Sequence, residues 1–240
     1  MNPETRQKIQ LALGVALAVT AIRAGYIVYQ RYSEKAQDAA QTEKKAPPLD
    51  ADAYVTPKKL YPYDLKSAKQ LTRQPVWVRE GYHHTFYPYD PARGRTDFSR
   101  EAGLLLPLQK LQIKDVVTDS APHSAHIQQI MAVFEQQGKP FALSIGTVNG
   151  NSFTFYSDYY FFIEDPHELY RHWSRDVWEA IDQHQVKPGM SELQVDFSVG
   201  MGVLDRSSDS AVKTAHYPNG GKPLIVTYRN GKAEEVRPGE

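Results

Sequence analysis

The sequence predicts an α+β protein with an N-terminal transmembrane helix, a β-rich module, and a last module of two helices followed by three strands. A long apolar run near the start predicts the transmembrane helix. Alternating apolar and aromatic residues predict the β-rich module, and helical spacing followed by three short strands predicts the last one. The expected boundaries are 1–32 for the anchor, 33–53 for a polar tether, and 54–164 and 165–240 for the two modules.

Charge and cysteine content exclude several function classes. The chain of 240 residues has 28 Lys plus Arg and 28 Asp plus Glu, so no net charge attracts it to nucleic acid, and we expect no nucleic-acid partner. It has no cysteine, which excludes disulfides and Cys-based metal sites. Most of its fifteen tyrosines lie between Tyr54 and Tyr160, where they favour β structure because aromatic rings fit a pleated, half-buried surface.

The apolar run covers residues 9–30 and contains one charge, Arg23. About 20 apolar residues cross a bilayer core, so this segment predicts an uncleaved anchor in contact with the lipid bilayer. The alternative is a cleaved signal peptide that ends near Ala21 or Ala24. The aromatic residues expected at the membrane interface are Tyr26, Tyr29 and Tyr32.

The module at residues 54–164 is predicted to hold four or five strands and one helix. Residues 123–139 form the expected helix, because their apolar residues follow helical spacing and Gly138 stands at the position that ends a helix. A β-hairpin is expected next, with its turn at Asn149–Gly150, a strong signal for a two-residue turn. A small barrel or curled sheet accommodates these elements.

The last module is predicted to start with a helix of about five turns, because four apolar residues recur at every fourth position. They are Leu169, Trp173, Val177 and Ile181. Asp165 and Pro166 suit the start of this helix. A second, two-turn helix is expected between the capping box of Ser191 and Gln194 and the stop at Gly200. The three strands expected after it are 212–217, 224–228 and 233–236.

The connection between these helices carries the pattern V-x-x-G-M-S-x-x-x-V. Its positions are Val186, Gly189, Met190, Ser191 and Val195. With the short helix and the three strands that follow, it resembles the SmpA/OmlA domain, the fold of the BamE-type lipoproteins of the outer-membrane assembly machinery. The resemblance covers about 30% of the chain, from Asp165 to Val236. The chain departs from the family in having no lipobox cysteine, and it has Val-Gly-Met-Gly at residues 199–202 where the family has Leu-Gly-x-Pro.

A second resemblance concerns residues 101–117, which with the later hairpin look like a bacterial SH3-like barrel. The BamE-like resemblance implies a non-enzymatic binding or scaffold protein, an accessory subunit of a cell-envelope assembly or membrane protein complex. Its partners would be other membrane or envelope proteins. With the apolar run, it predicts a single-pass protein of the bacterial cytoplasmic membrane with a periplasmic body, although the Lys and Arg residues around the run favour a cytoplasmic body.

The sequence shows no recognisable catalytic motif. It has no G-x-S-x-G, no Walker loop, no G-x-G-x-x-G and no H-E-x-x-H. Its histidines occur in pairs, such as His123 with His126 and His167 with His172, whereas zinc needs three or four ligands that converge. We therefore expect no enzyme, metal or cofactor. The alternatives are a membrane-anchored hydrolase or metal-dependent enzyme that uses the histidines, and a cell-wall-binding sensor.

Two sets of residues are singled out as candidate sites. The aromatic runs at residues 82–90 and 153–162 either fill the core or form an exposed interaction surface, since tyrosines suit both roles. The candidate interaction residues in them are Tyr87, Tyr89, Tyr156, Tyr159 and Tyr160. The second set is a structural joint between the two helices, in which a positive φ is expected at Gly189 and a buried side chain at Met190. It consists of Pro188, Gly189, Met190 and Ser191.

Overall fold

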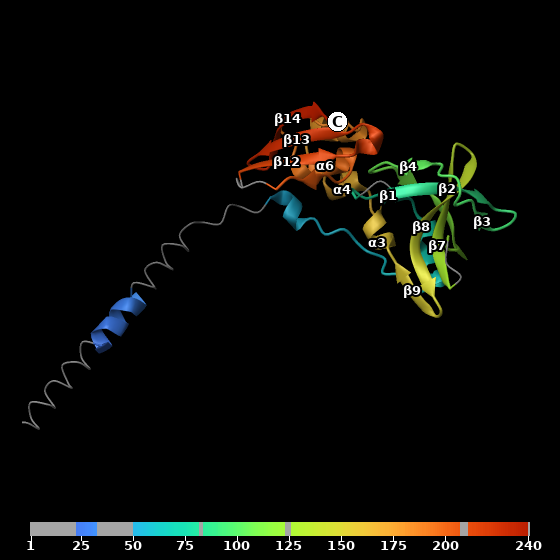
Figure 1. Cartoon of the computed structure of the whole chain (residues 1–240), viewed down its shortest axis with the longest axis horizontal. Helices are drawn as coiled ribbons and strands as arrows, with labels where there is room; N and C mark the ends of the chain where they lie inside the picture. The colour runs from blue at the N-terminus through green and yellow to red at the C-terminus, as the bar shows by residue number, and fades with distance from the viewer. Residues whose placement is uncertain (1–22, 33–49, 82–83, 123–125, 207–210, 240) are drawn as a thin grey trace, which may run out of the picture. The chain divides into compact units, whose positions relative to one another are not determined.

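Three antiparallel β-sheets, connected by short helices, make up the described part of the chain (Figure 1). Contacts divide the chain into two units, residues 1–53 and residues 54–240, and all three sheets belong to the second unit. The computed structural model describes residues 23–32, 50–81, 84–122, 126–206 and 211–239.

The largest sheet has seven strands in the order β3-β2-β8-β7-β6, with β4 paired to β2 and β9 paired to β8. The long strands β7 and β8 form its centre. Its strands are β2 (His84–Asp90), β3 (Arg95–Thr96), β4 (Gly103–Leu105), β6 (Ile113–Ser120), β7 (Ile127–Gln136), β8 (Lys139–Asn149) and β9 (Ser152–Phe155). The predicted β8–β9 hairpin is present, but its turn consists of Gly150 and Asn151, one residue later than predicted, because Asn149 still pairs with Ser152; Gly150 has φ +57°.

The two smaller sheets have the orders β10-β1-β5 and β11-β12-β13-β14. Their strands are β1 (Val76–Val78), β5 (Lys110–Leu111), β10 (Phe161–Phe162), β11 (Val203–Leu204), β12 (Val212–Tyr217), β13 (Leu224–Arg229) and β14 (Lys232–Pro238). The α-helices are α2 (Leu65–Ala68), α3 (Ser157–Tyr160), α4 (Pro166–Leu169), α5 (Arg175–Asp182) and α6 (Glu192–Val199). The 3-10 helices are η1 (Ala51–Tyr54), η2 (Lys69–Arg73) and η3 (Asn219–Gly221).

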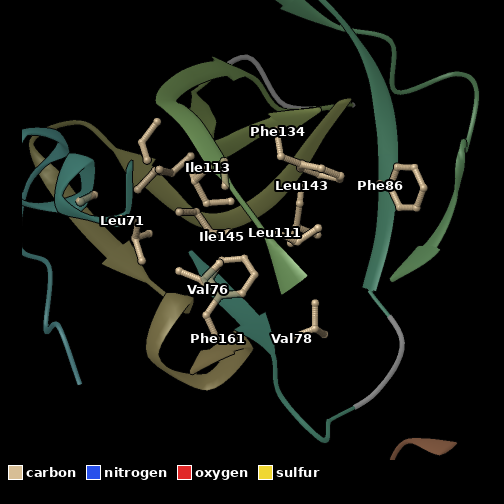
Figure 2. Close-up of a cluster of buried hydrophobic side chains, with 14 of the residues drawn as sticks. Leu71, Val76, Val78, Phe86, Leu111, Ile113, Phe134, Leu143, Ile145 and Phe161 are labelled. Carbon is tan, nitrogen blue, oxygen red and sulfur yellow. The ribbon is translucent and has the colours of Figure 1, made fainter. Parts of the chain in front are cut away.

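Two large hydrophobic clusters form the interior. The first cluster lies against the seven-stranded sheet and includes Phe134, Leu143 and Ile145, which point toward one another in Figure 2. The second cluster lies between the helices α5 and α6 and the four-stranded sheet, and includes Trp178 and Phe197. A small third cluster covers the opposite face of β7 and β8.

The predicted helix at residues 123–139 is wrong, because its described part is the central strand β7. Residues of β7 alternate between two clusters: Ile130, Ala132 and Phe134 belong to the first, and Met131 and Val133 to the third. A strand that is buried on both faces has a continuous apolar sequence. Such a sequence has no period of two, and the spacing of its apolar residues also fits a helical face.

The predicted helix of five turns is also wrong, because it is divided into the short helices α4 and α5. The chain leaves the helical conformation at Tyr170, with φ −109° and ψ 35°, and α5 begins after Ser174. A straight helix would spread residues 170, 173 and 178 over about 140° of its circumference, at 3.6 residues per turn. The break lets Tyr170, Trp173 and Trp178 pack in the same cluster.

The end of the chain has helix α6 and the strands β12, β13 and β14 where the sequence placed them. Ser191 and Gln194 form the expected capping box, and Gly200 ends α6 with φ +87°. The sheet has a fourth strand, β11, that the sequence analysis missed. With α5 and α6 of eight residues each, the described chain is a β-rich protein with three sheets and a few short helices, which corrects the predicted α+β class.

The predicted single-pass anchor is contradicted as well. Among the residues that the structure describes, no helix is long and apolar enough to cross a membrane. The described helix at residues 23–32 carries Arg23 and Arg31, while residues 9–22 of the predicted span lie outside the described ranges. A transmembrane helix needs about 20 predominantly apolar residues, whereas the described helix has ten residues and two arginines. The predicted location in the bacterial cytoplasmic membrane with a periplasmic body is corrected on the same finding, whereas the lipid contact of residues 9–30 stays a prediction.

Candidate functional site

A segment without helix or strand, residues 55–63, runs along the surface before α2; it is called the strap below. The carboxylate of Asp158 in α3 holds it. The backbone N–H of Leu60 donates to Oδ1 of Asp158 at 3.0 Å, and the N–H of Tyr61 donates to Oδ2 at 2.8 Å. Because one side chain satisfies two successive amides, the strap has a fixed position on α3.

A second carboxylate fastens the strap closer to its start. Glu164 accepts a hydrogen bond from the backbone N–H of Lys58 at 2.8 Å, and its Oε1 lies 2.7 Å from Nζ of the same lysine. The side-chain and backbone hydrogen bonds from Lys58, with the charge of its ammonium group, lower the pKa of Glu164. The contact therefore favours the ionised carboxylate.

The strap and α3 enclose a small pocket with a volume of about 230 Å³. It is lined by Lys59, Tyr61, Pro62, Phe155, Asp158 and Tyr159. Two of these residues are tyrosines that remain 71% exposed, Tyr61 and Tyr159, and Nζ of Lys59 lies 5.6 Å from the ring centroid of Tyr159. These six residues form what is called the tyrosine surface below. Tyr63, which is 77% exposed, follows it in the strap.

The five predicted interaction residues are divided between surface and interior. Tyr159 lies in the tyrosine surface, and Tyr156, which precedes α3, is 37% exposed. Tyr160 packs against the first cluster, and burial raises the pKa of its hydroxyl. Tyr87 and Tyr89 are half-buried on β2, far from α3 in the sequence, and neither lines the pocket.

Sequence reasoning missed Tyr61 and Tyr63. Tyr61 is joined to Asp158 across 97 positions of the chain, and no local pattern signals such a contact. One signal was available, because "YPYD" places Pro62 between two tyrosines in a polar stretch where nothing predicted a core strand.

The four joint residues lie away from the tyrosine surface and serve the core. Gly189 has φ +89°, and its N–H donates to the carbonyl of Ala233 in β14 at 2.8 Å. The N–H of Ala233 donates in turn to the carbonyl of Met190, which is 2% exposed in the second cluster. Pro188 is exposed, while Ser191 caps α6. The joint therefore fastens the start of α6 to the last strand.

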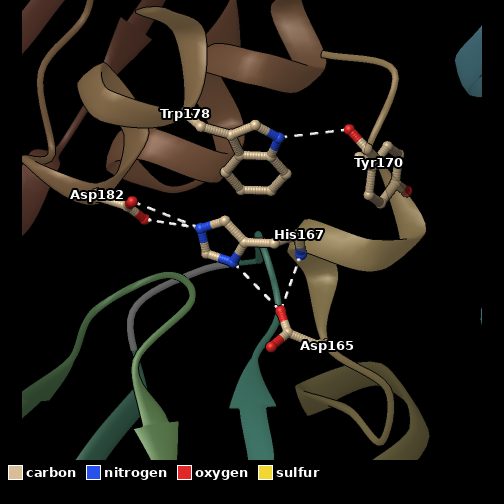
Figure 3. A network of polar contacts seen from close by, with 5 residues as sticks. All are labelled: Asp165, His167, Tyr170, Trp178 and Asp182. Carbon is tan, nitrogen blue, oxygen red and sulfur yellow. Dashed lines mark hydrogen bonds and ion pairs between the residues drawn. The ribbon is translucent and has the colours of Figure 1, made fainter. Parts of the chain in front are cut away.

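The histidine pairs do not form a metal site in the described chain, and His83 and His123 lie outside it. His167 lies between two carboxylates (Figure 3): Nδ1 is 3.2 Å from Asp165 and Nε2 is 3.2 Å from Asp182. Because the two ring nitrogens face different partners, the three side chains do not converge on one point. The imidazole also stacks on Trp178 at 4.0 Å between centroids, so it links α4 to α5.

A cluster of polar side chains joins helix α6 to the strands β12 and β13 of the four-stranded sheet. The hydroxyls of Tyr217 and Tyr228, both 1% exposed, are 2.6 Å apart. Tyr217 is also hydrogen-bonded to the carboxyl group of Asp196. Burial, with the nearby charges of Glu192 and Glu80, raises the pKa of Asp196 to about 7. The hydrogen bonds to Tyr217 and Gly202 lower this pKa, but their effect is smaller than the increase. Burial likewise raises the pKa of both tyrosines.

Comparison with known proteins adds no relative: no family model, no curated protein and no solved structure matches the chain. The resemblances to the SmpA/OmlA domain and to an SH3-like barrel therefore stay predictions from the sequence. What the described residues define is a β-rich protein with an exposed tyrosine surface on a fixed strap.

Proposed function

We propose that the chain is a non-enzymatic binding protein, a scaffold or accessory subunit that holds a partner protein on its tyrosine surface. The observation that carries the proposal is the exposure of Tyr61 and Tyr159, 71% each, beside a pocket lined by Pro62 and Phe155. Tyrosine supplies a large contact area at low conformational cost and is enriched at protein interfaces.

The backbone of the strap supports the same proposal. Tyr61 has φ +50°, a conformation that costs a non-glycine residue free energy, and the two bonds to Asp158 hold it there. Strain of this kind concentrates at functional positions. A strap that only covered the core would bury its tyrosines, whereas here the backbone is fixed and the rings of Tyr61 and Tyr63 are exposed.

A site-specific photo-crosslinker tests the proposal in the full chain. Placed at position 159 or 61 in cells of the source organism, it should capture one and the same protein. Placed at Leu104, an exposed residue outside the tyrosine surface, it should not capture that protein. The purified partner should then bind Tyr159→Ala about tenfold or more weakly, or about 1.4 kcal/mol. Tyr159→Phe, which keeps the ring, should retain most of the affinity.

Two results would contradict the proposal. One is equal capture from positions 159 and 104. The other is a captured partner whose affinity is the same for the wild type and for a Tyr61→Ala, Tyr159→Ala double variant that keeps the melting temperature of the wild type.

A further inference from the structure

A groove with a volume of about 630 Å³ lies between the loop after α5 and one end of the four-stranded sheet. Sites for small molecules typically have roughly 300–1,000 Å³ and mostly apolar walls with a few polar groups. The apolar lining residues are Val186, Pro223, Leu224, Val236 and Pro238. None of them lines the pocket of the tyrosine surface, so this is a separate feature.

The wall made by the loop after α5 is held by one buried residue. Ser198 in α6, which is 0% exposed, accepts a hydrogen bond from Nδ1 of His184 on its carbonyl at 2.8 Å. Its hydroxyl donates to the carbonyl of Gln185 at 2.9 Å. A carbonyl only accepts, so Nδ1 carries the proton and the ring has one orientation. The loop is therefore fixed to α6 before any ligand arrives.

The opposite wall is held by the backbone. The N–H of Gly239 donates to the carbonyl of Pro223 at 2.8 Å, and the side-chain amide of Asn219 donates to the carbonyl of Lys222 at 3.0 Å. A groove with two fixed walls loses little conformational entropy when a ligand binds.

The described lining of the groove carries a positive charge. Among the described lining residues, Lys222 has the permanently charged side chain and none has a carboxylate. Within the described ranges no ion pair engages the exposed ammonium group of Lys222. An apolar groove with an exposed lysine in its lining complements a molecule that has an apolar body and a single negative end.

We propose that this groove binds a small amphiphilic monocarboxylate. Its hydrocarbon body lies against Val186, Leu224 and Val236, and its carboxylate forms an ion pair with Lys222. The burial of the hydrocarbon supplies most of the affinity, because apolar area removed from water is the larger favourable contribution. The ion pair at the edge selects an acid over a neutral molecule of the same shape.

Octanoate and octanol, titrated separately into the full chain, test the proposal because they differ in charge at similar size. Backbone amide shifts of Leu224 and Gly239 should saturate with octanoate, and octanol should bind about tenfold more weakly. Lys222→Gln should remove this difference by weakening octanoate alone. Lys232→Gln, a matched change of an exposed lysine that does not line the groove, should leave both affinities unchanged. Val236→Thr, nearly isosteric but polar, should weaken both ligands.

Three outcomes overturn the proposal. One is the absence of saturable shifts with octanoate up to about 10 mM, well above the ordinary range of specific affinities. Another is equal affinity for octanoate and octanol in the wild type. The third is that a short apolar peptide with a free C-terminal carboxylate binds the groove while octanoate does not, which would assign the site to a peptide end instead.

Discussion

Asp196 is a carboxyl group that the fold holds where its charge is unfavourable. Burial and the charge of Glu192, one turn earlier in α6, raise its pKa to about 7, compared with about 3.9 in an unfolded chain. Between these two values the unfolded chain has released the proton and the folded chain has kept it. The unfolded state then binds fewer protons, so the free energy of unfolding falls as the pH rises from about 4 to about 7.

Asp196→Asn should therefore stabilise the protein in a pH-dependent manner. The amide keeps an acceptor for the N–H of Gly202 and supplies a donor for Tyr217, but it cannot ionise. Above pH 7 the variant should exceed the wild type by on the order of 2–4 kcal/mol in urea unfolding, and the difference should vanish near pH 4. Glu235→Gln, at an exposed position, serves as the control. A difference that stays constant from pH 4 to pH 8 would refute the assignment.

Met190 fills the space between α6 and the four-stranded sheet at 2% exposure. Met190→Ala should lower the free energy of unfolding by about 2–5 kcal/mol, the usual range for such a truncation in a core. Met201→Ala removes the same atoms from a side chain that is 40% exposed. It should change the free energy of unfolding by less than about 0.5 kcal/mol. Gly189→Val should cost at least about 1–3 kcal/mol, because valine at φ +89° is strained. Equal melting temperatures for the wild type and Met190→Ala would show that the side chain has no packing role.

At the scale of elements, the strap is held by polar contacts and by two partly buried apolar side chains, Val55 and Leu60, among its nine residues. Its link to α3 is the pair of bonds that Asp158 accepts from Leu60 and Tyr61, and both amides lie at the surface or close to it. A segment with few buried apolar contacts opens at low free energy. The strap should therefore detach without global unfolding when this carboxylate is changed.

Asp158→Asn should release the strap, because an amide offers one acceptor oxygen where the carboxylate offers two. Hydrogen exchange at the amides of Leu60 and Tyr61 should become at least about tenfold faster, while the melting temperature changes little. Asp97→Asn is a matched control, since the described partners of that carboxylate, Ser99 and Arg100, lie within three residues of it. Unchanged exchange at both strap amides would show that other contacts hold the strap.

The elements that the sequence predicted correctly are those with local signals. The capping box at Ser191, the hairpin turn that contains Gly150 and the glycine stop at Gly200 lie within a few residues of what they determine. The prediction of a helix in place of β7 was wrong because β7 is buried on both faces, and this burial depends on the assembled sheet rather than on the local sequence. The break at Tyr170 was not predicted for the same reason, because the three aromatic rings that require it pack in a cluster formed with distant strands.

The candidate site shows the same division. Tyr159 could be found from the sequence, since the three tyrosines at residues 156–160 cannot all face inward. Its partners in the strap could not, because they meet α3 through Asp158 and Tyr159, which lie nearly one hundred residues further along the chain. Local composition indicates that an aromatic surface exists, whereas the long-range contact determines which rings compose it.

At the scale of the whole molecule, the sheet β10-β1-β5 is a wall shared by the two large clusters. Successive residues of a strand point to opposite faces. Val76 and Val78 accordingly belong to the first cluster, and Trp77 packs against the second. In β10, Phe161 belongs to the first cluster and Phe162 to the second. Neither cluster keeps this wall if the other unfolds, so residues 54–240 should unfold in one cooperative transition.

Phe162→Ala tests this cooperativity, because the side chain is 0% exposed and belongs to the second cluster alone. It should cost about 3–5 kcal/mol. The loss should appear equally in two probes: tryptophan fluorescence, which reports the second cluster through Trp173 and Trp178, and hydrogen exchange of the β7 amides, which reports the first. Leu104→Ala, at an exposed position, should move neither probe. If fluorescence changed at a lower urea concentration while the β7 amides stayed protected, the clusters would be independent folding units and the shared wall would not couple them.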